Sequence, residues 1–245
     1  MRRFGLIGKS LKHSFSKDFF TKKFAAEGLN DCSYELFELE HIEQLPGLIS
    51  AQCPEGLNVT IPYKTEVLPY LDHQDEAVEK IGACNCIRIS GGKLYGFNTD
   101  APAFLASLKK YLQPQHQCAL VLGTGGASKA VCFALEQMHL DYLQVSRRKH
   151  GSEIGYEDVS PEMISKHKVI INTTPLGMFP NTNQEPAIPY ESITADHLLF
   201  DLVYNPAKTK FLEKGERMGA TVVNGYEMLV LQAEESWKIW NASED

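Results

Sequence analysis

The chain has 245 residues, of which 43% are apolar and 22% charged, a balance that favours globular domains over a disordered chain. Its 24 Lys and Arg residues against 31 Asp and Glu residues give a formal net charge of −7, which argues against a general nucleic-acid-binding protein because such proteins need a basic surface. No apolar run approaches the length of a membrane span, and too few apolar residues precede Lys9 to form a signal peptide, so we expect a cytoplasmic protein.

Residues 1–100 mix short apolar runs with irregular connections, and we expect them to form an α/β domain. Residues 4–8 are typical of a strand. Residues 17–27 carry apolar side chains at helical spacing, and Gly28 suits a C-terminal helix cap. Apolar residues on both sides of Gly91-Gly92 predict a β-hairpin.

From residue 101 onward, predicted strands and helices alternate. Residues 118–122 form the continuous apolar run of a strand that is buried on both faces of a parallel sheet. Comparable runs follow with room for helices between them, so residues 101–225 predict a doubly wound, Rossmann-type domain. An amphipathic helix is expected over residues 226–240. The later strands are expected at 142–145, 169–171, 198–202 and 221–223, and the helices at 128–138 and 209–218.

A glycine-rich loop connects the apolar run at 118–122 to the following helical segment. Gly123 permits a tight turn, Gly125 lets the backbone approach a pyrophosphate, and the small Ser128 allows the helix and strand to pack closely. The helix N-terminus offers N–H groups and the positive end of a dipole to phosphates. This arrangement predicts a dinucleotide site, with a tight turn that binds nothing as the alternative. The expected contacts are Gly123, Thr124, Gly125, Gly126 and Ala127.

The end of the next predicted strand carries Ser146, Arg147, Arg148 and Lys149. NAD-binding proteins usually place an acidic residue at this point to hold the ribose 2′-hydroxyl, and an acid would repel a 2′-phosphate. Guanidinium groups bind phosphate well, and the hydroxyl of Ser146 can add a hydrogen bond. The sequence therefore favours NADP as the cofactor, with a solvated basic turn as the alternative.

Polar residues of the first domain indicate a ligand site near the end of a strand. On a strand, Asn58 and Thr60 point to the same face. Pro62 suits the first turn of a following helix, which would place Lys64 near the strand's carboxyl end, where α/β sheets bind ligands. Taken alone, Lys64 would more often be a surface lysine than a catalytic one.

Two other segments allow a structural and a functional interpretation. The hydroxyls of Ser14 and Ser16 could bind a carboxylate, but Ser16 followed by Asp18 also fits an N-terminal helix cap. Cys84 and Cys86 are weak evidence for zinc without nearby histidines, so we expect buried free thiols and no metal site.

In their order along the chain, these segments resemble the shikimate dehydrogenase family. The resemblance covers nearly the whole chain, and so many collinear motifs seldom arise by chance. The motifs are Gly8-x-x-x-x-His13-Ser14-x-Ser16, Asn58-Val59-Thr60-x-Pro62-x-Lys64, Gly82-Ala83-x-Asn85, Gly96-x-Asn98-Thr99-Asp100, Gly123-x-Gly125-Gly126-Ala127-Ser128, Asn172-x-Thr174-Pro175-x-Gly177-Met178, Asp201-x-Val203-Tyr204-Asn205-Pro206 and Gly225-x-x-Met228-Leu229-x-x-Gln232-Ala233.

The resemblance implies an oxidoreductase that reversibly reduces 3-dehydroshikimate to shikimate with NADPH, in the pathway to chorismate and the aromatic amino acids. Lys64 and Asp100 match the family's catalytic pair. Hydride arriving at a carbonyl leaves negative charge on oxygen, so an ammonium group such as that of Lys64 stabilises the transition state and can donate the proton. The substrate contacts that the resemblance implies are Ser14, Ser16, Asn58, Thr60, Lys64, Asn85, Asp100, Tyr204 and Gln232.

The resemblance also implies which residues meet the reactive end of the cofactor. Thr173, Val203 and Gly225 would line the nicotinamide, in addition to the phosphate contacts. The last segment, residues 226–245, would pack back on residues 1–100 and complete the substrate domain.

Three departures from the family pattern bear on these expectations. Residues 148–168 form a short segment broken by Gly and Pro, so the helix expected there should be reduced or missing, along with any basic residue it would bring to the cofactor. Cys84 and Cys86 stand where the family more often has Val and Thr. The sequence ends soon after Trp240, so we expect a further C-terminal helix of longer relatives to be absent.

Several functions remain to be separated by experiment. A quinate/shikimate dehydrogenase that uses NAD is disfavoured because Arg147 and Arg148 stand in place of an acid. A non-catalytic regulator that senses shikimate is disfavoured because Lys64 and Asp100 are both present. A structural protein would leave the phosphate loop unexplained. We expect a monomer or homodimer that binds small molecules, with no nucleic-acid or membrane partner.

Overall fold

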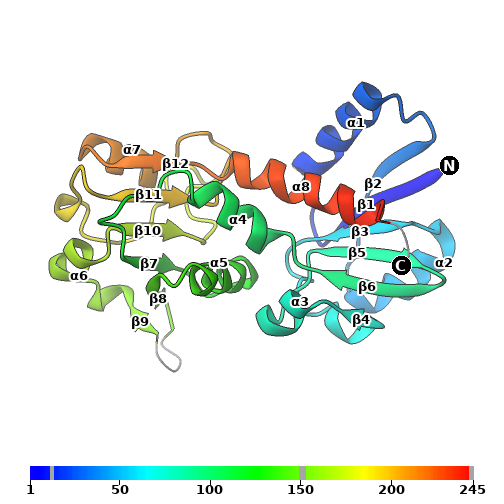
Figure 1. Ribbon diagram of the computed structural model, residues 1–245, viewed down its shortest axis with the longest axis horizontal. Helices are drawn as coiled ribbons and strands as arrows, with labels where there is room; N and C mark the ends of the chain where they lie inside the picture. The colour runs from blue at the N-terminus through cyan, green and yellow to red at the C-terminus, as the bar shows by residue number, and fades with distance from the viewer. Residues whose placement is uncertain (12–13, 149–152, 243–245) are drawn as a thin grey trace. The chain divides into compact units, whose positions relative to one another are not determined.

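The computed structural model describes residues 1–11, 14–148 and 153–242, and the chain divides into two compact units. The first unit comprises Met1–Thr99 with Ala233–Asp245, and the second comprises Asp100–Gln232 (Figure 1). His13 and Lys149, which belong to the motifs discussed above, and the last three residues of the expected 226–245 segment lie outside the described residues. Assigning substrate to the first unit and cofactor to the second stays a prediction.

The six-stranded sheet of the first unit has the order β2-β1-β3-β5-β6-β4. Strand β1 lies parallel to both of its neighbours, β2 and β3. Strand β5 is antiparallel to both of its neighbours, β3 and β6. The hairpin predicted at Gly91-Gly92 is confirmed, since both glycines have positive φ between β5 and β6. The strands are β1 (Arg2–Gly8), β2 (Cys32–Glu38), β3 (Gly56–Val59), β4 (His73–Gln74), β5 (Cys86–Ser90) and β6 (Lys93–Phe97).

The helices α1 (Phe15–Glu27), α2 (Leu45–Gln52) and α3 (Glu76–Ile81) belong to the same unit as this sheet. Gly28 caps α1 in the left-handed conformation, as predicted. The prediction of Ser16 as the N-terminal cap is wrong, because the cap lies two residues earlier. The hydroxyl of Ser14 accepts from the backbone N–H of Ser16 at 3.2 Å, and Ser14 is therefore the cap.

The expected helix starting at Pro62 is also wrong. Residues 61–67 form turns, and the next helical element is the short 3₁₀ helix at Leu68–Tyr70. The N–H of Tyr63 bonds to the carbonyl of Thr60, and that of Val67 bonds to the carbonyl of Tyr63. This mixture of three- and four-residue spacings does not continue into an α-helix.

The second unit contains a wholly parallel sheet in the order β12-β11-β10-β7-β8-β9. This is the predicted doubly wound, Rossmann-type arrangement, and the expected strands are all present. The strands are β7 (Cys118–Leu122), β8 (Asp141–Ser146), β9 (Ile154–Gly155), β10 (Val169–Asn172), β11 (Leu198–Asp201) and β12 (Thr221–Val223). The helices are α4 (Asp100–Leu108), α5 (Gly126–Gln137), α6 (Pro161–Lys166) and α7 (Lys210–Arg217).

Helices cover both faces of this sheet (Figure 1). Phe104 of α4 and Leu135 of α5 pack against one face in a cluster with Val121 of β7, and Ile164 of α6 and Phe211 of α7 pack against the other. The strand residues alternate between the two clusters, because successive side chains of a strand point to opposite faces. The helix expected between β8 and β10 is reduced to the six residues of α6, as predicted from the short, Gly- and Pro-broken segment.

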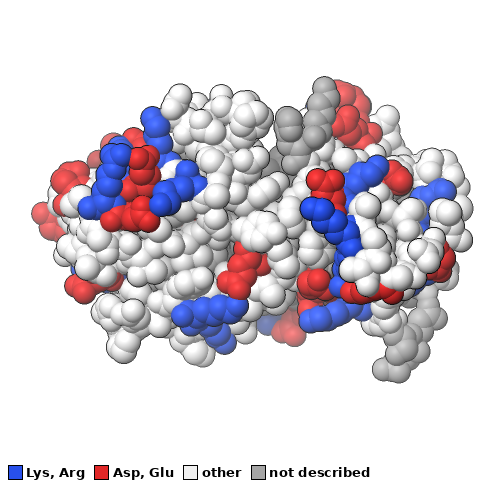
Figure 2. Space-filling view, turned by 90° about the horizontal axis from the view of Figure 1, so that it is seen from above, with Lys and Arg blue, Asp and Glu red and all other residues white. Residues whose placement is uncertain are grey.

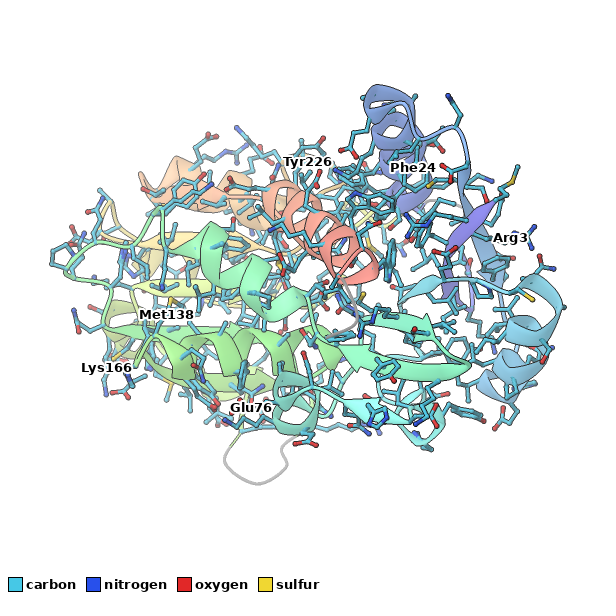
Figure 3. The ribbon with its side chains drawn as sticks, turned by 45° about the vertical axis from the view of Figure 1, so that its right-hand side comes forward. Arg3, Phe24, Glu76, Met138, Lys166 and Tyr226 are labelled. Carbon is cyan, nitrogen blue, oxygen red and sulfur yellow. The ribbon has the colours of Figure 1, made fainter. Side chains whose placement is uncertain are left out.

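The last helix, α8 (Tyr226–Trp240), contributes to both units. Met228, in its first part, belongs to the apolar cluster of the second unit. Trp237 and Trp240 belong to a cluster of the first unit, where the ring of Trp240 stacks on that of Phe4 at 4.9 Å. Phe24 of α1, labelled in Figure 3, lies 5.2 Å from Trp237 between ring centroids. The boundary therefore falls inside the helix rather than at residue 226.

Charged side chains of both signs are interspersed on the face shown in Figure 2, rather than gathered by sign. Ion pairs on and beside α7 are of this kind, joining Lys208 to Glu216 and Arg217 to Glu213. No helix among the described residues is long and apolar enough to cross a membrane.

Candidate functional site

The glycine loop after β7 has the geometry that a dinucleotide phosphate needs. Gly123 has a φ of 113°, and a Cβ atom there would lie 2.6 Å from Oγ1 of Thr173, so only glycine fits. A Cβ atom at Gly125 would meet no atom of the described residues within 4 Å, which leaves the backbone at the start of α5 open to a ligand. The buried hydroxyl of Ser128 donates to the carbonyl of Gly123 at 2.8 Å and ties the helix to the loop.

Thr124, Gly126 and Ala127 complete this loop. Thr124 is exposed, while Gly126 and Ala127 begin α5 and are partly buried. Gly125 precedes the helix with no side chain to cap it, so the first N–H groups of α5 have no capping partner from that residue. The predicted phosphate contacts therefore form one continuous segment whose chemistry suits an anion.

The basic turn at the end of β8 presents two exposed guanidinium groups, those of Arg147 and Arg148. The buried Ser146 hydroxyl accepts from the N–H of Arg148 at 3.2 Å and shapes the turn. Burial raises the pKa of Tyr156, and the positive charge of Arg147 opposes that rise. Both arginines follow the strand beside β7, so they suit a 2′-phosphate at the same edge as the glycine loop.

Thr173, Val203 and Gly225, predicted for the nicotinamide end, follow three adjacent strands of the same sheet. The hydroxyl of Thr173 donates to the carbonyl of Leu122 at 2.7 Å. The N–H of Gly225 donates to the carbonyl of Val203 at 3.2 Å. The fold therefore gathers these residues at the carboxyl edge of the second unit.

In the first unit, Asn58 lies at the centre of a buried hydrogen-bond network. Its Oδ1 accepts from the hydroxyl of Tyr34 at 2.8 Å. Its Nδ2 donates to the carbonyl of Asn85 at 3.3 Å and to the hydroxyl of Ser236 at 2.8 Å. Because both amide hydrogens are used within the chain, a ligand can reach Asn58 only as a donor to Oδ1.

Asn85 is held in a similar way. Its Oδ1 accepts from the N–H of Thr99 at 2.7 Å, and its Nδ2 donates to the Thr99 hydroxyl at 2.9 Å. Asn85 and Thr99 are both buried, at 2% and 0% exposure, so the amide has one fixed orientation. One of its two donor hydrogens has no partner among the described residues.

The remaining predicted residues of the first unit lie after the carboxyl ends of β1 and β3. Ser14 and Ser16 lie at the start of α1, and the Ser14 oxygen already accepts from a backbone N–H. Thr60 and Lys64 are partly buried in the segment that follows β3. The carbonyl of Lys64 accepts from the N–H of Cys84 at 2.7 Å, which anchors the lysine backbone to the unit.

Three predicted substrate contacts belong to the second unit. Asp100 is the first residue of α4 and is 7% exposed. Tyr204 follows β11 and is partly buried, and the amide of Gln232 in α8 donates to the carbonyl of Leu229 at 2.9 Å. That these side chains act together with those of the first unit stays a prediction.

The two cysteines beside Asn85 are buried free thiols, as expected. Burial raises the pKa of Cys84 to about 12, so it remains a neutral thiol at physiological pH. Among the described residues, no group of three or more His, Cys, Asp or Glu side chains is placed to hold a metal ion.

Sequence reasoning assigned no function to Tyr34, Ser236 and Asp201, all of which hold predicted site residues in place. Tyr34 resembled any aromatic residue of a strand, and Ser236 is a single hydroxyl in an amphipathic helix. Asp201 was visible within a motif, and a buried acid at a strand end is itself an unusual signal.

A parallel sheet with an open glycine loop, joined to a second α/β unit that buries a polar network, defines a two-unit dinucleotide-binding protein. The model of the shikimate dehydrogenase substrate-binding domain matches residues 6–87. The chain belongs to the shikimate dehydrogenase family, as the motifs predicted, and is therefore an oxidoreductase.

Relatives match over nearly the full length. The NADP(+) shikimate dehydrogenase of Carboxydothermus hydrogenoformans is 37% identical over 96% of this chain and 90% of its own length. The enzyme of the same name from Methanosphaera stadtmanae is 33% identical with the same coverage. The solved structure of shikimate 5-dehydrogenase from Thermus thermophilus in complex with NADP(H) and shikimate has a TM-score of 0.88 at 32% identity, covering 98% of this chain and 94% of the other.

Proposed function

We propose that this chain catalyses the reversible, NADPH-dependent reduction of 3-dehydroshikimate to shikimate. The observation that carries the proposal is the match, over nearly the full length, to relatives named as NADP(+) shikimate dehydrogenases. The open phosphate loop and the exposed basic turn support it, since both suit the cofactor that these names specify.

The chain's own residues would hold the cofactor along one edge of the second unit. Gly123 to Ala127 would bind the pyrophosphate through backbone N–H groups, and Ser146, Arg147 and Arg148 would bind the 2′-phosphate. When bound, NADPH supplies the hydride.

Ser14 and Ser16 would donate hydroxyl hydrogens to the substrate carboxylate, and Thr60, Tyr204 and Gln232 would contact the ring hydroxyls. Both amide hydrogens of Asn58 are donated within the chain, and this limits how Asn58 can bind the substrate. A substrate hydroxyl would have to donate its hydrogen to Oδ1 of this residue. Asn85 keeps one amide hydrogen for a substrate oxygen.

Lys64 would carry the proton. As an ammonium group it stabilises the negative charge that develops on the C3 oxygen and then donates a proton to that oxygen, and in reverse the neutral amine accepts it. Asp100 would orient the ammonium group. General acid–base help of this kind contributes roughly 10²–10⁴ in rate.

Initial rates with shikimate or quinate, each against NADP or NAD, test the proposal. We expect the fastest turnover with shikimate and NADP. Faster turnover with quinate and NAD would assign the alternative dehydrogenase, and binding of shikimate and NADPH without any turnover would assign a metabolite sensor. A cytoplasmic location and a monomer or homodimer are part of the same proposal, and cell fractionation and sedimentation measurements test them.

A further inference from the structure

Asp201 is the last residue of β11 and lies beside Asn172, the last residue of β10, in the register of the parallel sheet. The Asp201 and Asn172 side chains are both fully buried. A buried carboxylate is costly unless several donors satisfy it, so its partners indicate what its presence achieves.

Three groups donate to this carboxylate. The Nδ2 of Asn172 and the backbone N–H of Val203 donate to Oδ1 at 2.9 and 3.0 Å. The hydroxyl of Thr209 donates to Oδ2 at 2.5 Å. Burial raises the pKa of Asp201 to about 6, and the bonds from Thr209, Val203 and Asn172 oppose the rise. The two carboxylate oxygens can accept from all three groups at once.

Each partner sets the shape of a different segment. Asn172 is locked on its other side, since its Oδ1 accepts from the N–H of Thr174 at 3.1 Å and from the Thr174 hydroxyl at 2.6 Å. Thr209 caps α7 by accepting from the N–H of Leu212. The N–H of Val203 donates to the carboxylate of Asp201, and the carbonyl of Val203 accepts from the N–H of Gly225.

The segments that Asp201 joins are those that carry the predicted nicotinamide contacts. Thr173 lies between Asn172 and Thr174, and Val203 bonds to the carboxylate directly. A Cβ atom at Gly225 would lie 2.1 Å from the carbonyl oxygen of Leu202, so this third segment is packed tightly against the second. One buried carboxylate thus fixes two of the three segments, and the third packs on them.

We propose that Asp201 is a positioning residue for the nicotinamide end of the cofactor, acting through Asn172, Val203 and Thr209. The inference rests on the proposed function, because it takes the segments at Thr173 and Val203 as the nicotinamide site. Asp201 does not itself touch the cofactor in this proposal. It sets the backbone that does.

The test compares two ligands in the variant Asp201→Ala. NADPH reaches both ends of the site, whereas adenosine 2′,5′-bisphosphate carries the adenine and the 2′-phosphate without nicotinamide. We expect the dissociation constant of NADPH, followed by its fluorescence, to rise roughly tenfold, since the orientation of several backbone contacts is lost. The constant for adenosine 2′,5′-bisphosphate should change by less than about twofold, because the hydrogen-bond partners of Asp201 among the described residues belong to neither the glycine loop nor the basic turn.

Two further variants sharpen the comparison. Asp201→Asn keeps one acceptor oxygen for Asn172 and Val203 and loses only the acceptor for Thr209, so its NADPH affinity should lie between wild type and Asp201→Ala. It also decides the question if the alanine variant does not fold. Asp196→Ala removes an exposed carboxylate just before the same strand and should leave both affinities unchanged.

Equal weakening of both ligands would overturn the proposal, because Asp201 would then only support the folded unit. So would wild-type affinity for NADPH in both Asp201 variants. If the wild-type chain bound neither ligand, both the proposed cofactor site and the role of Asp201 would be overturned. A wild-type chain that binds NADPH but does not oxidise shikimate would overturn the proposed reaction while leaving the role of Asp201 to be decided by the affinities.

Discussion

The hydroxyl of Ser236 in α8 accepts a hydrogen bond of 2.8 Å from Nδ2 of Asn58 at the end of β3. These residues lie 178 positions apart in the sequence, and both are buried. The bond ties the second half of α8 to the strand that precedes Lys64. It also uses an amide hydrogen that would otherwise be available to a ligand, and so limits what Asn58 can recognise.

Replacing Ser236 should weaken substrate binding without affecting the cofactor. In Ser236→Ala one amide hydrogen of Asn58 is left buried without its acceptor, and we expect the KM for shikimate to rise about three- to tenfold. Ser236→Thr retains the hydroxyl and should restore most of the affinity. Ser107→Ala removes a buried hydroxyl of the second unit, and its KM for shikimate should match wild type. Wild-type KM in Ser236→Ala would show that this bond does not position Asn58 for the substrate.

Lys64→Ala should abolish most turnover while leaving shikimate bound. We expect kcat to fall by roughly 10²–10⁴, the contribution of a general acid, with shikimate binding still detectable by calorimetry. Lys93→Ala, at an exposed position of the hairpin, is the matched control and should keep wild-type kcat. Full activity in Lys64→Ala would falsify the assigned role.

The double variant Arg147→Ala, Arg148→Ala should lose its preference for NADP. Without guanidinium groups for the 2′-phosphate, kcat/KM with NADP should fall about tenfold to a hundredfold, while kcat/KM with NAD stays near wild type. Lys166→Ala removes a charge at the end of α6 and should change neither value. An equal loss with both cofactors would mean that the turn supports the fold rather than the phosphate.

Stability should decline as the pH falls below about 6.5, partly because of His197. Burial lowers the pKa of this residue in the folded chain, and its Nδ1 accepts from the N–H of Thr194 at 3.0 Å while Nε2 donates to the carbonyl of Ile164. The unfolded chain therefore takes up a proton on this imidazole at a higher pH than the folded chain does, which favours unfolding as the pH drops. The stabilising contribution of the neutral His197 is fully present above the pKa that this residue has in the unfolded chain, and it is lost as the pH falls below that value.

Urea denaturation of wild type and His197→Asn between pH 7.5 and 5.5 measures this effect. Asparagine keeps an acceptor for Thr194 but does not titrate, so the variant should be less stable at pH 7.5 and yet lose less stability on acidification. The carboxyl of Asp201, whose pKa is raised to about 6, contributes with the opposite sign, but equally in both proteins. Parallel pH curves for the two proteins would exclude a contribution from His197.

Local patterns were sufficient for the strands of the second unit and for its glycine loop. Its strands are continuous apolar runs because both faces of the sheet are covered, and the glycine loop has a geometry that only a few residue types allow. The sequence-based predictions were wrong at two places where a local hydrogen bond within a single turn of the backbone decides the structure. Ser14 rather than Ser16 caps α1, and the segment after Pro62 does not continue as a helix, because both outcomes depend on bonds that composition does not specify.

Residue identity and spacing were enough to indicate the family, the cofactor and the side chains expected to meet the substrate. The tertiary structure decided how those side chains are held. Neither the hydrogen bonds of Asn58 with Tyr34 and Ser236 nor the donors around Asp201 could be read from local sequence, because the partners come from distant segments. A buried polar group needs hydrogen-bonding partners wherever the fold supplies them, and only the folded chain shows which ones it has.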